Sequence, residues 1–220
     1  MLPGSLPETG SLFFSASKMV RFLFDMDGTV TARETLPMIA ERYGILDQVE
    51  DLTREAVQGD VPFVESFEKR VAVLGRLPVN EVSRLVAQAP LHELVVNFIA
   101  GHRDQCAIVT SNLDCWCDGL IAKLNCRTHC SSAQVADNRV QAITHILCKQ
   151  DVVAAYQAAG DIVVFLGDGH NDREAMSRAD VAIAVGLLPS TPAASLIGVA
   201  HHVFHDETAL CRFLEALAHQ

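Results

Sequence analysis

Two carboxylates stand two residues apart in the segment Asp25-Met26-Asp27-Gly28-Thr29-Val30, directly after the apolar run Val20 to Phe24. Buried side by side, such carboxylates repel each other, and keeping both charged without a cation is costly. Mg²⁺ relieves this cost, because it prefers oxygen ligands and commonly takes one or two carboxylates together with phosphate and water. A carboxylate beside the metal can attack phosphorus, and a second one can protonate the leaving oxygen and then activate water. Asp25 suits the first role and Asp27 the second.

The isolated segment is equally compatible with an ordinary acidic turn after a strand, and three other parts of the chain favour the catalytic interpretation. Gly167-Asp168-Gly169-His170-Asn171-Asp172 follows another apolar run, so we expect Asp168 to complete a magnesium site. Asp172 is expected to bind the metal through water or to orient Lys149, with helix capping as its structural alternative. Thr110-Ser111-Asn112 offers hydroxyls and backbone amides for phosphate oxygens. Lys149 can supply positive charge to the transferring phosphoryl group, although a lone Lys is usually just solvated.

Apolar runs alternate with helical patterns along most of the chain. The runs that we interpret as buried parallel strands are 20–24, 107–109, 162–166, 181–185 and, more weakly, 203–204. The helical patterns cover residues 92–102, 114–124, 149–159, 172–179 and 207–218. This alternation predicts an α/β fold with a doubly wound parallel sheet. Ligands collect at the carboxyl ends of such strands, where Asp25, Thr110 and Asp168 all fall.

Residues 34–90 interrupt this alternation, because they are helical throughout and too long for a crossover. We expect a small helical cap, inserted after the first strand, that closes over the strand ends and excludes water. The polar stretch 127–141, with a turn at Asp137-Asn138, predicts a short hairpin beside the core. The expected organisation is a core of residues 19–33 and 91–220, a cap of residues 34–90, and a disordered leader or engineered remnant at residues 1–18.

The composition of the 220 residues predicts a globular cytoplasmic enzyme. Hydrophobic residues make up 50% and charged residues 20% of the chain, without a window of roughly 18 uninterrupted apolar residues that would span a membrane. The formal net charge of −10 disfavours nonspecific nucleic-acid binding, which needs clustered Lys and Arg. We therefore expect a small phosphorylated metabolite as the partner, and neither a nucleic acid nor a membrane.

Seven cysteines, an odd number without the dense spacing of a disulfide scaffold, favour reduced thiols. A zinc site is the alternative at Cys115-Trp116-Cys117 or at Cys126 to Cys130 with His129, but the spacing is irregular. The histidines of residues 201–205 raise the same question, and we expect them at polar or half-buried positions of a late strand.

Four motifs of the haloacid dehalogenase superfamily resemble segments of this chain in order and in context, over about residues 20 to 186. Those segments are Asp-x-Asp-Gly-Thr-Val, Thr110-Ser111, Lys149 and Gly-Asp-Gly-x-Asn-Asp. Within the superfamily the chain looks most like the phosphoserine phosphatases, which carry a small helical cap in the same place. The resemblance implies Mg²⁺ as the cofactor. The ligands it implies are Asp25, Asp168, the backbone carbonyl of Asp27 and, through water, Asp172; the phosphate contacts it implies are Thr110, Ser111 and Lys149.

The same resemblance indicates which cap residues contact the substrate. Glu34 follows the first motif as the family's substrate-binding Glu does, and Arg70 is placed like the Arg that holds the substrate carboxylate. Phe63 resembles the family's cap aromatic over the ligand, and Asn112 and Asn171 complete the expected substrate contacts. An Arg binds a carboxylate bidentately and a Glu pairs with an ammonium, which together select a phosphorylated amino acid. The alternative is that Glu34 and Arg70 are solvated helix residues.

Two departures from the phosphoserine phosphatase pattern leave the substrate open. Asp27-Gly28-Thr29 and Thr110-Ser111-Asn112 stand where those enzymes usually read Asp-Ser-Thr and Ser-Gly-Gly. The leading hypothesis is Mg²⁺-dependent hydrolysis of a small phosphomonoester, phosphoserine first, through an aspartyl phosphate on Asp25. The alternatives are phosphoryl transfer to another acceptor, hydrolysis of another metabolite such as a methylthioribulose-pathway phosphate, and a noncatalytic phosphate-binding module.

Overall fold

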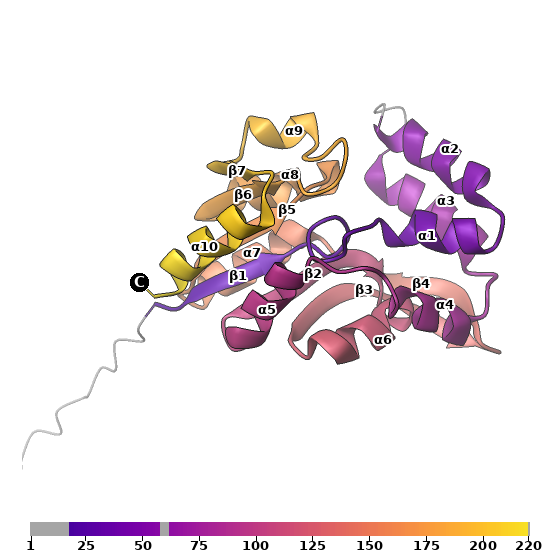
Figure 1. Ribbon diagram of the computed structural model, residues 1–220. Coiled ribbons are helices and arrows are strands. Elements are labelled where there is room, and N and C mark those ends of the chain that lie inside the picture. Colours follow the sequence, from indigo (N-terminus) through magenta and orange to yellow (C-terminus); the bar gives the residue numbers. More distant parts are fainter. Residues whose placement is uncertain (1–17, 58–61, 220) are drawn as a thin grey trace, which may run out of the picture.

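A seven-stranded sheet crosses the centre of the computed structural model, which describes residues 18–57 and 62–219 (Figure 1). The sheet order is β4-β3-β2-β1-β5-β6-β7, and all neighbours pair in parallel except β3 and β4. The strands are β1 (Val20–Phe24), β2 (Cys106–Leu113), β3 (Arg127–Ala136), β4 (Arg139–His145), β5 (Ile162–Gly167), β6 (Val181–Val185) and β7 (His202–Phe204). The leader predicted at residues 1–18 lies outside the described residues, apart from Lys18.

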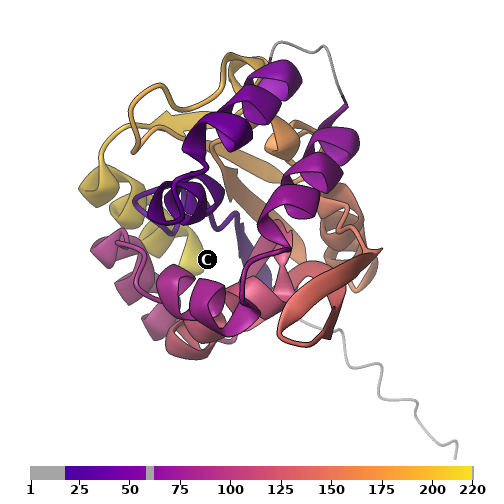
Figure 2. The same ribbon diagram turned by 90° about the vertical axis from the view of Figure 1, so that its right-hand side faces the viewer.

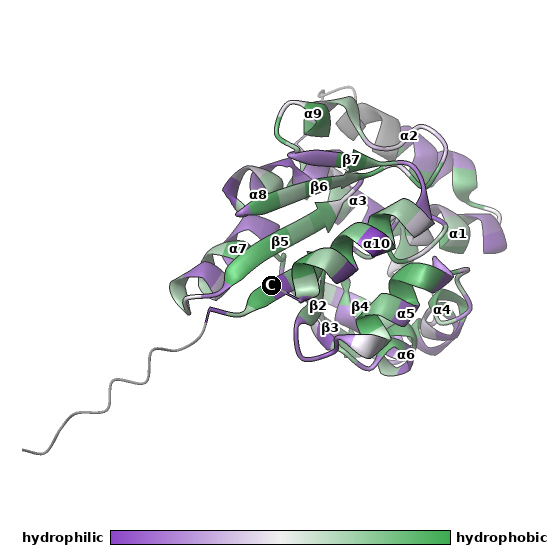
Figure 3. Ribbon diagram, turned by 60° about the vertical axis from the view of Figure 1, so that its left-hand side comes forward, coloured by the Kyte–Doolittle hydropathy of each residue, from purple (hydrophilic) through white to green (hydrophobic). Residues whose placement is uncertain are grey.

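Helices cover both faces of the sheet, because successive side chains of a strand point to opposite faces. Phe22 and Phe24 of β1 pack with one group of helices, and Leu23 between them packs with the other. The first group is α5 (Glu93–Gly101), α6 (Asp114–Leu124) and α10 (Glu207–Ala218), and the second is α7 (Lys149–Ala158), α8 (Arg173–Arg178) and α9 (Ala194–Ile197). Figure 3 shows hydrophobic colour along β5 and β6 between these layers. The predicted doubly wound α/β fold is confirmed.

Four helices fill the segment that follows β1: α1 (Thr35–Arg42), α2 (Leu46–Val57), α3 (Phe63–Leu74) and α4 (Val79–Val86). Helices α1, α2 and α3 pack on one another and stand beyond the end of β1 (Figures 1 and 2). Helix α4 packs mainly against α6 of the core, where the Gly119 amide donates to Ser83 Oγ at 3.2 Å. We therefore propose that α1 to α3 form the cap and that α4 belongs with the core.

The predicted hairpin lies in the main sheet, not beside it. β3 pairs in parallel with β2, from Ala107 opposite Arg127 to Thr110 opposite Cys130, before it pairs with β4. β4 occupies the edge, so most of its side chains are exposed and its sequence lacks an apolar run. Because β4 lacks an apolar run, the predicted hairpin ended at residue 141, whereas β4 continues to His145.

The strand predicted at 107–109 and the helix predicted at 172–179 differ from the observed elements. β2 continues to Leu113, with an irregular register against β3 between Thr110 and Leu113. A single 3₁₀ turn, His170–Asp172, precedes α8. The helix begins late because Asp172 Oδ2 accepts hydrogen bonds from the amides of Asp168 and Gly169, at 3.1 and 3.0 Å. In the described part of the chain, the helices are too short or too polar to cross a bilayer.

The contact between α4 and α6 predicts a cost for any side chain at Gly119. A Cβ there would lie 2.9 Å from the Ala87 Cβ and 3.2 Å from the Ser83 carbonyl oxygen. We expect Gly119→Ala to lower the free energy of unfolding, because overpacking usually costs about 1–3 kcal/mol. The higher helix propensity of Ala offsets part of this loss. Urea unfolding of the purified protein measures this change.

The matched control is Gly101→Ala in α5, where an added Cβ meets nothing within 4 Å. This variant should keep or gain stability, by up to about 1 kcal/mol. Equal unfolding free energies for the two variants would contradict close packing of α4 on α6.

Candidate active site

Three buried carboxylates meet at the carboxyl edge of the sheet. Asp25 follows β1 and Asp168 follows β5, and these strands pair with Phe24 opposite Leu166. The Asp25 amide donates to the Leu166 carbonyl at 2.8 Å, which fixes the start of the loop. One oxygen from each of Asp25, Asp168 and Asp172 lies within 4.8 Å of the others. Residues 143 positions apart in the chain therefore form one anionic cluster.

Lys149 joins two of these carboxylates. Its Nζ lies 2.6 Å from Asp25 Oδ1 and 2.6 Å from Asp172 Oδ1, and the residue is only 2% exposed. Burial by itself lowers the pKa of Lys149, but Asp172 and then Asp25 outweigh it and raise that pKa above its usual value. The side chain is consequently a buried cation, and the alternative of a solvated surface Lys is wrong.

The third carboxylate, Asp168, lies outside the ion pairs that Lys149 makes. Burial, followed by the charges of Asp25 and Asp172, raises the pKa of Asp168 to about 9. An all-oxygen cluster with excess negative charge fits a hard divalent cation such as Mg²⁺. The oxygens of Asp25, Asp168 and Asp172 would hold it, while a water-mediated role for Asp172 and the Asp27 backbone carbonyl remain predictions.

Asp27 is held by the first turn of the cap. Its Oδ1 accepts a hydrogen bond from the Thr35 amide at 2.8 Å. Burial raises the pKa of Asp27, although the bonds from Thr35 act in the opposite direction. Asn112 Nδ2 in turn donates to Thr35 Oγ1 at 2.8 Å, so Thr35 lies between the two side chains. The sequence analysis missed Thr35, because a Thr at the start of a helix carries no distinguishing signal.

Side chains of the last residues of β2 and of neighbouring β3 hold the carboxyl end of β2 in place. Thr110 Oγ1 accepts from the Asn112 amide at 3.1 Å, and Asn112 Oδ1 accepts from the Leu113 amide at 2.8 Å. Ser131 Oγ of β3 donates to the Ser111 carbonyl at 2.7 Å. The Asn112 side chain thus bonds to Thr35 and to backbone within the protein, although the residue lines the pocket.

A compact pocket with a cavity volume of about 100 Å³ opens between the cap and these strand ends. The predicted residues that line it are Asp25, Asp27, Glu34, Phe63, Arg70, Thr110, Ser111, Asn112, Asp168 and Asn171. Leu36, Phe67 and Gly169 also line it and were not predicted, since two of them resemble ordinary apolar positions of a helix. Lys149 and Asp172 do not line it; they form the ion pair with each other.

The cap places opposite charges on its side of the pocket. Burial, followed by the charge of Asp27, raises the pKa of Glu34 to about 7. Burial lowers the pKa of Arg70, against the opposing charges of Glu34 and Asp27. The Arg70 guanidinium lies over the Phe63 ring, 5.9 Å from its centroid, and Nε donates to the Ser66 carbonyl at 3.3 Å. These contacts orient Arg70, which is not a freely solvated residue.

The cysteines do not form the alternative zinc site. In the ranges 18–57 and 62–219, no Cys belongs to a cluster of three or more potential metal ligands. All seven are free thiols, and burial raises the pKa of Cys115 and of Cys130 to about 11. Thiols of this kind are predominantly protonated and inert at neutral pH.

A family model described as haloacid dehalogenase-like hydrolase matches residues 20–180. The phosphoserine phosphatase of Archaeoglobus fulgidus is 26% identical over 175 residues, which cover 74% of this chain and 51% of that protein. The phosphoserine phosphatase of Halobacterium salinarum is 26% identical over 189 residues, 80% of this chain and 90% of that protein. The chain spans about half the length of the first curated relatives that it matches.

Solved structures share the fold. A structure described as a substrate-bound phosphoserine phosphatase complex superposes with a TM-score of 0.74 and covers 89% of this chain and 98% of that chain. Its sequence identity is 22%, so the likeness concerns the fold.

The raised pKa of Asp168 predicts that this side chain destabilises the metal-free protein. The pKa of Asp168 is near 9 in the folded protein, whereas an Asp in an unfolded chain has a pKa of about 3.9. Below a pH of about 3.9 the side chain is protonated in both states and lowers the free energy of unfolding little. As the pH rises from there toward 9, the unfolded state ionises more readily than the folded state, and the loss of unfolding free energy grows. In EDTA, we expect Asp168→Asn to raise the melting temperature, and more so at pH 8 than at pH 6. Scanning fluorimetry measures both values.

Mg²⁺ should raise the melting temperature of the original protein and have a smaller effect on Asp168→Asn, because binding to the folded state stabilises it. Asp118→Asn, at an exposed position of α6, is the control and should keep the full Mg²⁺ response. A melting temperature of Asp168→Asn that falls in EDTA at both pH values would contradict the charge cluster.

Proposed function

The chain belongs to the haloacid dehalogenase-like hydrolase family, and we propose that it hydrolyses a small phosphomonoester through an aspartyl phosphate on Asp25. The observation that carries this proposal is the buried carboxylate of Asp25, which pairs with Lys149 and lines the same pocket as Asp27. A noncatalytic binding module has little use for two such carboxylates. Mg²⁺, when bound, would offset the negative charge between these carboxylates and the phosphate.

The nucleophile is one oxygen of Asp25. Oδ1 accepts from the Met26 amide at 2.8 Å and pairs with Lys149 Nζ, which leaves Oδ2 to attack. A bond forms between Oδ2 and phosphorus while the bond from phosphorus to the ester oxygen breaks. Lys149 stabilises the negative charge near the attacked phosphorus. It also lowers the pKa of Asp25, against burial and the charge of Asp172, which together raise that pKa above its usual value.

Asp27 supplies and then recovers the proton. Its raised pKa favours the protonated acid, which gives its proton to the departing ester oxygen. The resulting carboxylate takes a proton from water, and the water oxygen bonds to phosphorus and releases Asp25 and inorganic phosphate. The hydrogen bond from the Thr35 amide orients the Asp27 carboxyl group for both steps.

The cap supports a phosphorylated amino acid as the substrate, with phosphoserine first. Arg70 can bind a carboxylate and Glu34 can bind an ammonium group, and both line the same pocket as Asp25. Phe63 lies against Arg70 and limits the remaining space. The similar proteins from Archaeoglobus fulgidus and Halobacterium salinarum are named phosphoserine phosphatases, which agrees with this substrate.

A larger metabolite is the second candidate substrate. A neighbouring cavity of about 270 Å³ shares Phe63, Ser111 and Asn171 with the pocket. A longer leaving group or an acceptor alcohol would find room there, which supports hydrolysis of another phosphate ester or phosphoryl transfer. A substrate panel distinguishes the metabolite, and added alcohols that compete with water distinguish transfer from hydrolysis.

We also propose a cellular location and a type of partner for this activity. The free cysteines support a reducing, cytoplasmic location. The net charge of −10 supports a small metabolite as the partner in preference to nucleic acid.

The proposed nucleophile predicts that Asp25→Asn loses turnover of phosphoserine by more than about 1,000-fold, because the amide neither attacks phosphorus nor forms the acyl phosphate. Phosphate release in the presence of Mg²⁺ measures the loss. Beryllofluoride should form an adduct with the original protein and not with Asp25→Asn. Full activity of Asp25→Asn would show that another group attacks, and Asp118→Asn is the control that should stay active.

The proposed contacts of Arg70 with a carboxylate and of Glu34 with an ammonium group predict that each variant changes KM only for substrates that carry the corresponding group. With phosphoserine, Arg70→Gln and Glu34→Gln should each raise KM by about 10-fold or more, the loss of one charge-assisted contact. With phosphoethanolamine, which has no carboxylate, Arg70→Gln should change KM little. With phosphoglycolate, which has no ammonium group, Glu34→Gln should change KM little.

The pKa of Glu34, about 7, adds a pH dependence to this test. Only the ionised carboxylate accepts from an ammonium group, so KM for phosphoserine should fall as the pH rises from 6 to 8. The fall should be absent in Glu34→Gln. Equal pH profiles for the two proteins, or equal losses on all three substrates, would contradict the assignment.

A further inference from the structure

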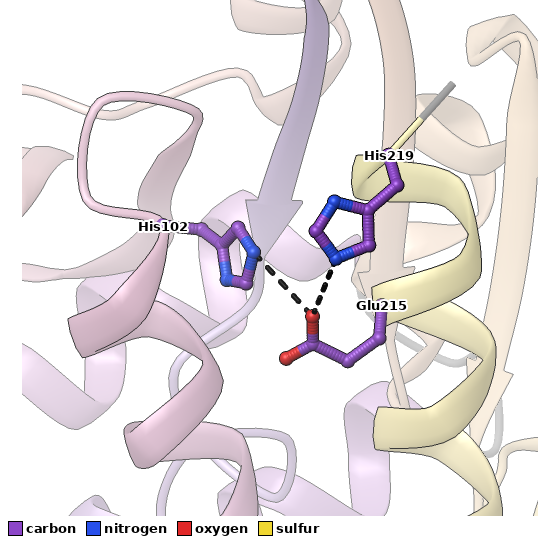
Figure 4. Close-up of side chains that lie close together, drawn as sticks. All are labelled: His102, Glu215 and His219. Carbon is purple, nitrogen blue, oxygen red and sulfur yellow. Dashed lines mark ion pairs between the residues drawn. The ribbon is translucent and has the colours of Figure 1, made fainter.

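A second cluster of potential metal ligands lies on the C-terminal helix, away from the catalytic pocket. His102 is the C-terminal cap of α5, and Glu215 and His219 stand one turn apart on α10 and its cap. One atom from each of the three lies within 4.8 Å of the others. Figure 4 shows both imidazole rings directed at the same carboxylate oxygen.

The distances leave space for an ion between the three side chains. Nε2 of His102 lies 3.5 Å and Nε2 of His219 lies 3.7 Å from Glu215 Oε2. Both separations exceed those of ordinary hydrogen bonds, about 2.7–3.2 Å. Zinc–nitrogen bonds of about 2.0–2.1 Å in a tetrahedral site separate neighbouring ligands by about 3.3 Å. Small rotations of the partly or fully exposed side chains of Glu215 and His219 would bring all three atoms to that spacing.

His102 is already oriented as a ligand. Its Nδ1 lies 3.1 Å from the Phe98 carbonyl oxygen, and its ring stacks on Phe98 with centroids 4.4 Å apart. A carbonyl only accepts, so Nδ1 carries a hydrogen, and in the neutral ring Nε2 then presents its lone pair toward Glu215. Metal-binding histidines usually have such a partner on the second nitrogen, which fixes the tautomer.

The donor types differ from those of the catalytic cluster. Two imidazole nitrogens and one carboxylate suit Zn²⁺ and related transition metals, whereas three carboxylates suit Mg²⁺. The side chains of His102, Glu215 and His219 are 18%, 47% and 77% exposed, so a metal can enter and solvent can complete its coordination. We propose that His102, Glu215 and His219 bind Zn²⁺ and thereby attach α10 to α5.

The position of this zinc site agrees with a structural role. Glu207, at the start of α10, accepts from the amides of Leu94 and Val95 at the start of α5, at 2.6 and 3.1 Å. The two helices therefore run in the same direction, and the proposed zinc site joins their other ends. His102 precedes the amino end of β2, whereas the pocket lies at the carboxyl end of that strand. Zinc bound here should stabilise the core without entering the proposed reaction.

Co²⁺ is the spectroscopic probe for this site, used with the untagged full chain at saturating Mg²⁺. We expect one equivalent to bind with the visible absorption of a nitrogen- and oxygen-coordinated ion, and to be displaced by Zn²⁺. His219→Ala and His102→Ala should each weaken binding more than about 10-fold, at least the loss seen when an outer partner of a metal site is removed. His145→Ala, at an exposed position of β4, should leave binding unchanged.

Two further measurements separate this site from the cysteines and from the catalytic cluster. Asp168→Asn should keep Co²⁺ binding, so failure of the proposed hydrolase function would leave the zinc test intact. Zn²⁺ should raise the melting temperature of the original protein and not of His219→Ala, whose replaced side chain is 77% exposed. Strong thiolate-to-metal absorption, equal affinity in His219→Ala and the original protein, or loss of binding in Asp168→Asn would each overturn the proposal.

Discussion

The buried ammonium group of Lys149 is the interaction on which the catalytic end of the protein depends. Taking an ammonium group out of water is costly unless carboxylates surround it, and here Asp25 and Asp172 lie at 2.6 Å on two sides. The second oxygen of Asp172 accepts from the amides of Asp168 and Gly169. The same carboxylate therefore holds the cation and shapes the loop that carries Asp168, so the position of each charged group depends on the others.

The sequence predicted this cluster because sheet topology alone brings its members together. Parallel strands that alternate with helices must place their carboxyl ends at one edge, whatever the exact register. An apolar run followed by Asp25, and another followed by Asp168, was therefore sufficient to predict that the two side chains meet. Lys149 was predicted only through its order among the motifs, since a Lys at the start of a helix has no local feature that marks it as buried.

The details that escaped prediction depend on packing between segments without a periodic pattern. β4 is a polar edge strand, and its place in the main sheet follows from pairing with β3 rather than from its own residues. Thr35 was missed because its role arises from two distant partners, Asp27 and Asn112. Asn112 was expected to contact the substrate, but its amide is hydrogen-bonded to Thr35. A linear sequence shows residue types, whereas these contacts require the cap to be seated on the core.

The packing of the cap on the core and the positioning of Asp27, the proposed general acid, depend on the same turn of α1. Glu34 faces the pocket, and the next residue, Thr35, donates its amide to Asp27. Any displacement of α1 that moves Glu34 also changes the hydrogen bond to the acid and the contact between Thr35 and Asn112. A substrate that draws Glu34 inward would consequently favour the arrangement in which Asp27 is held for proton transfer. In the proposed mechanism, ligand binding by Glu34 and proton transfer by Asp27 therefore depend on the same local geometry, so binding energy can contribute to catalysis.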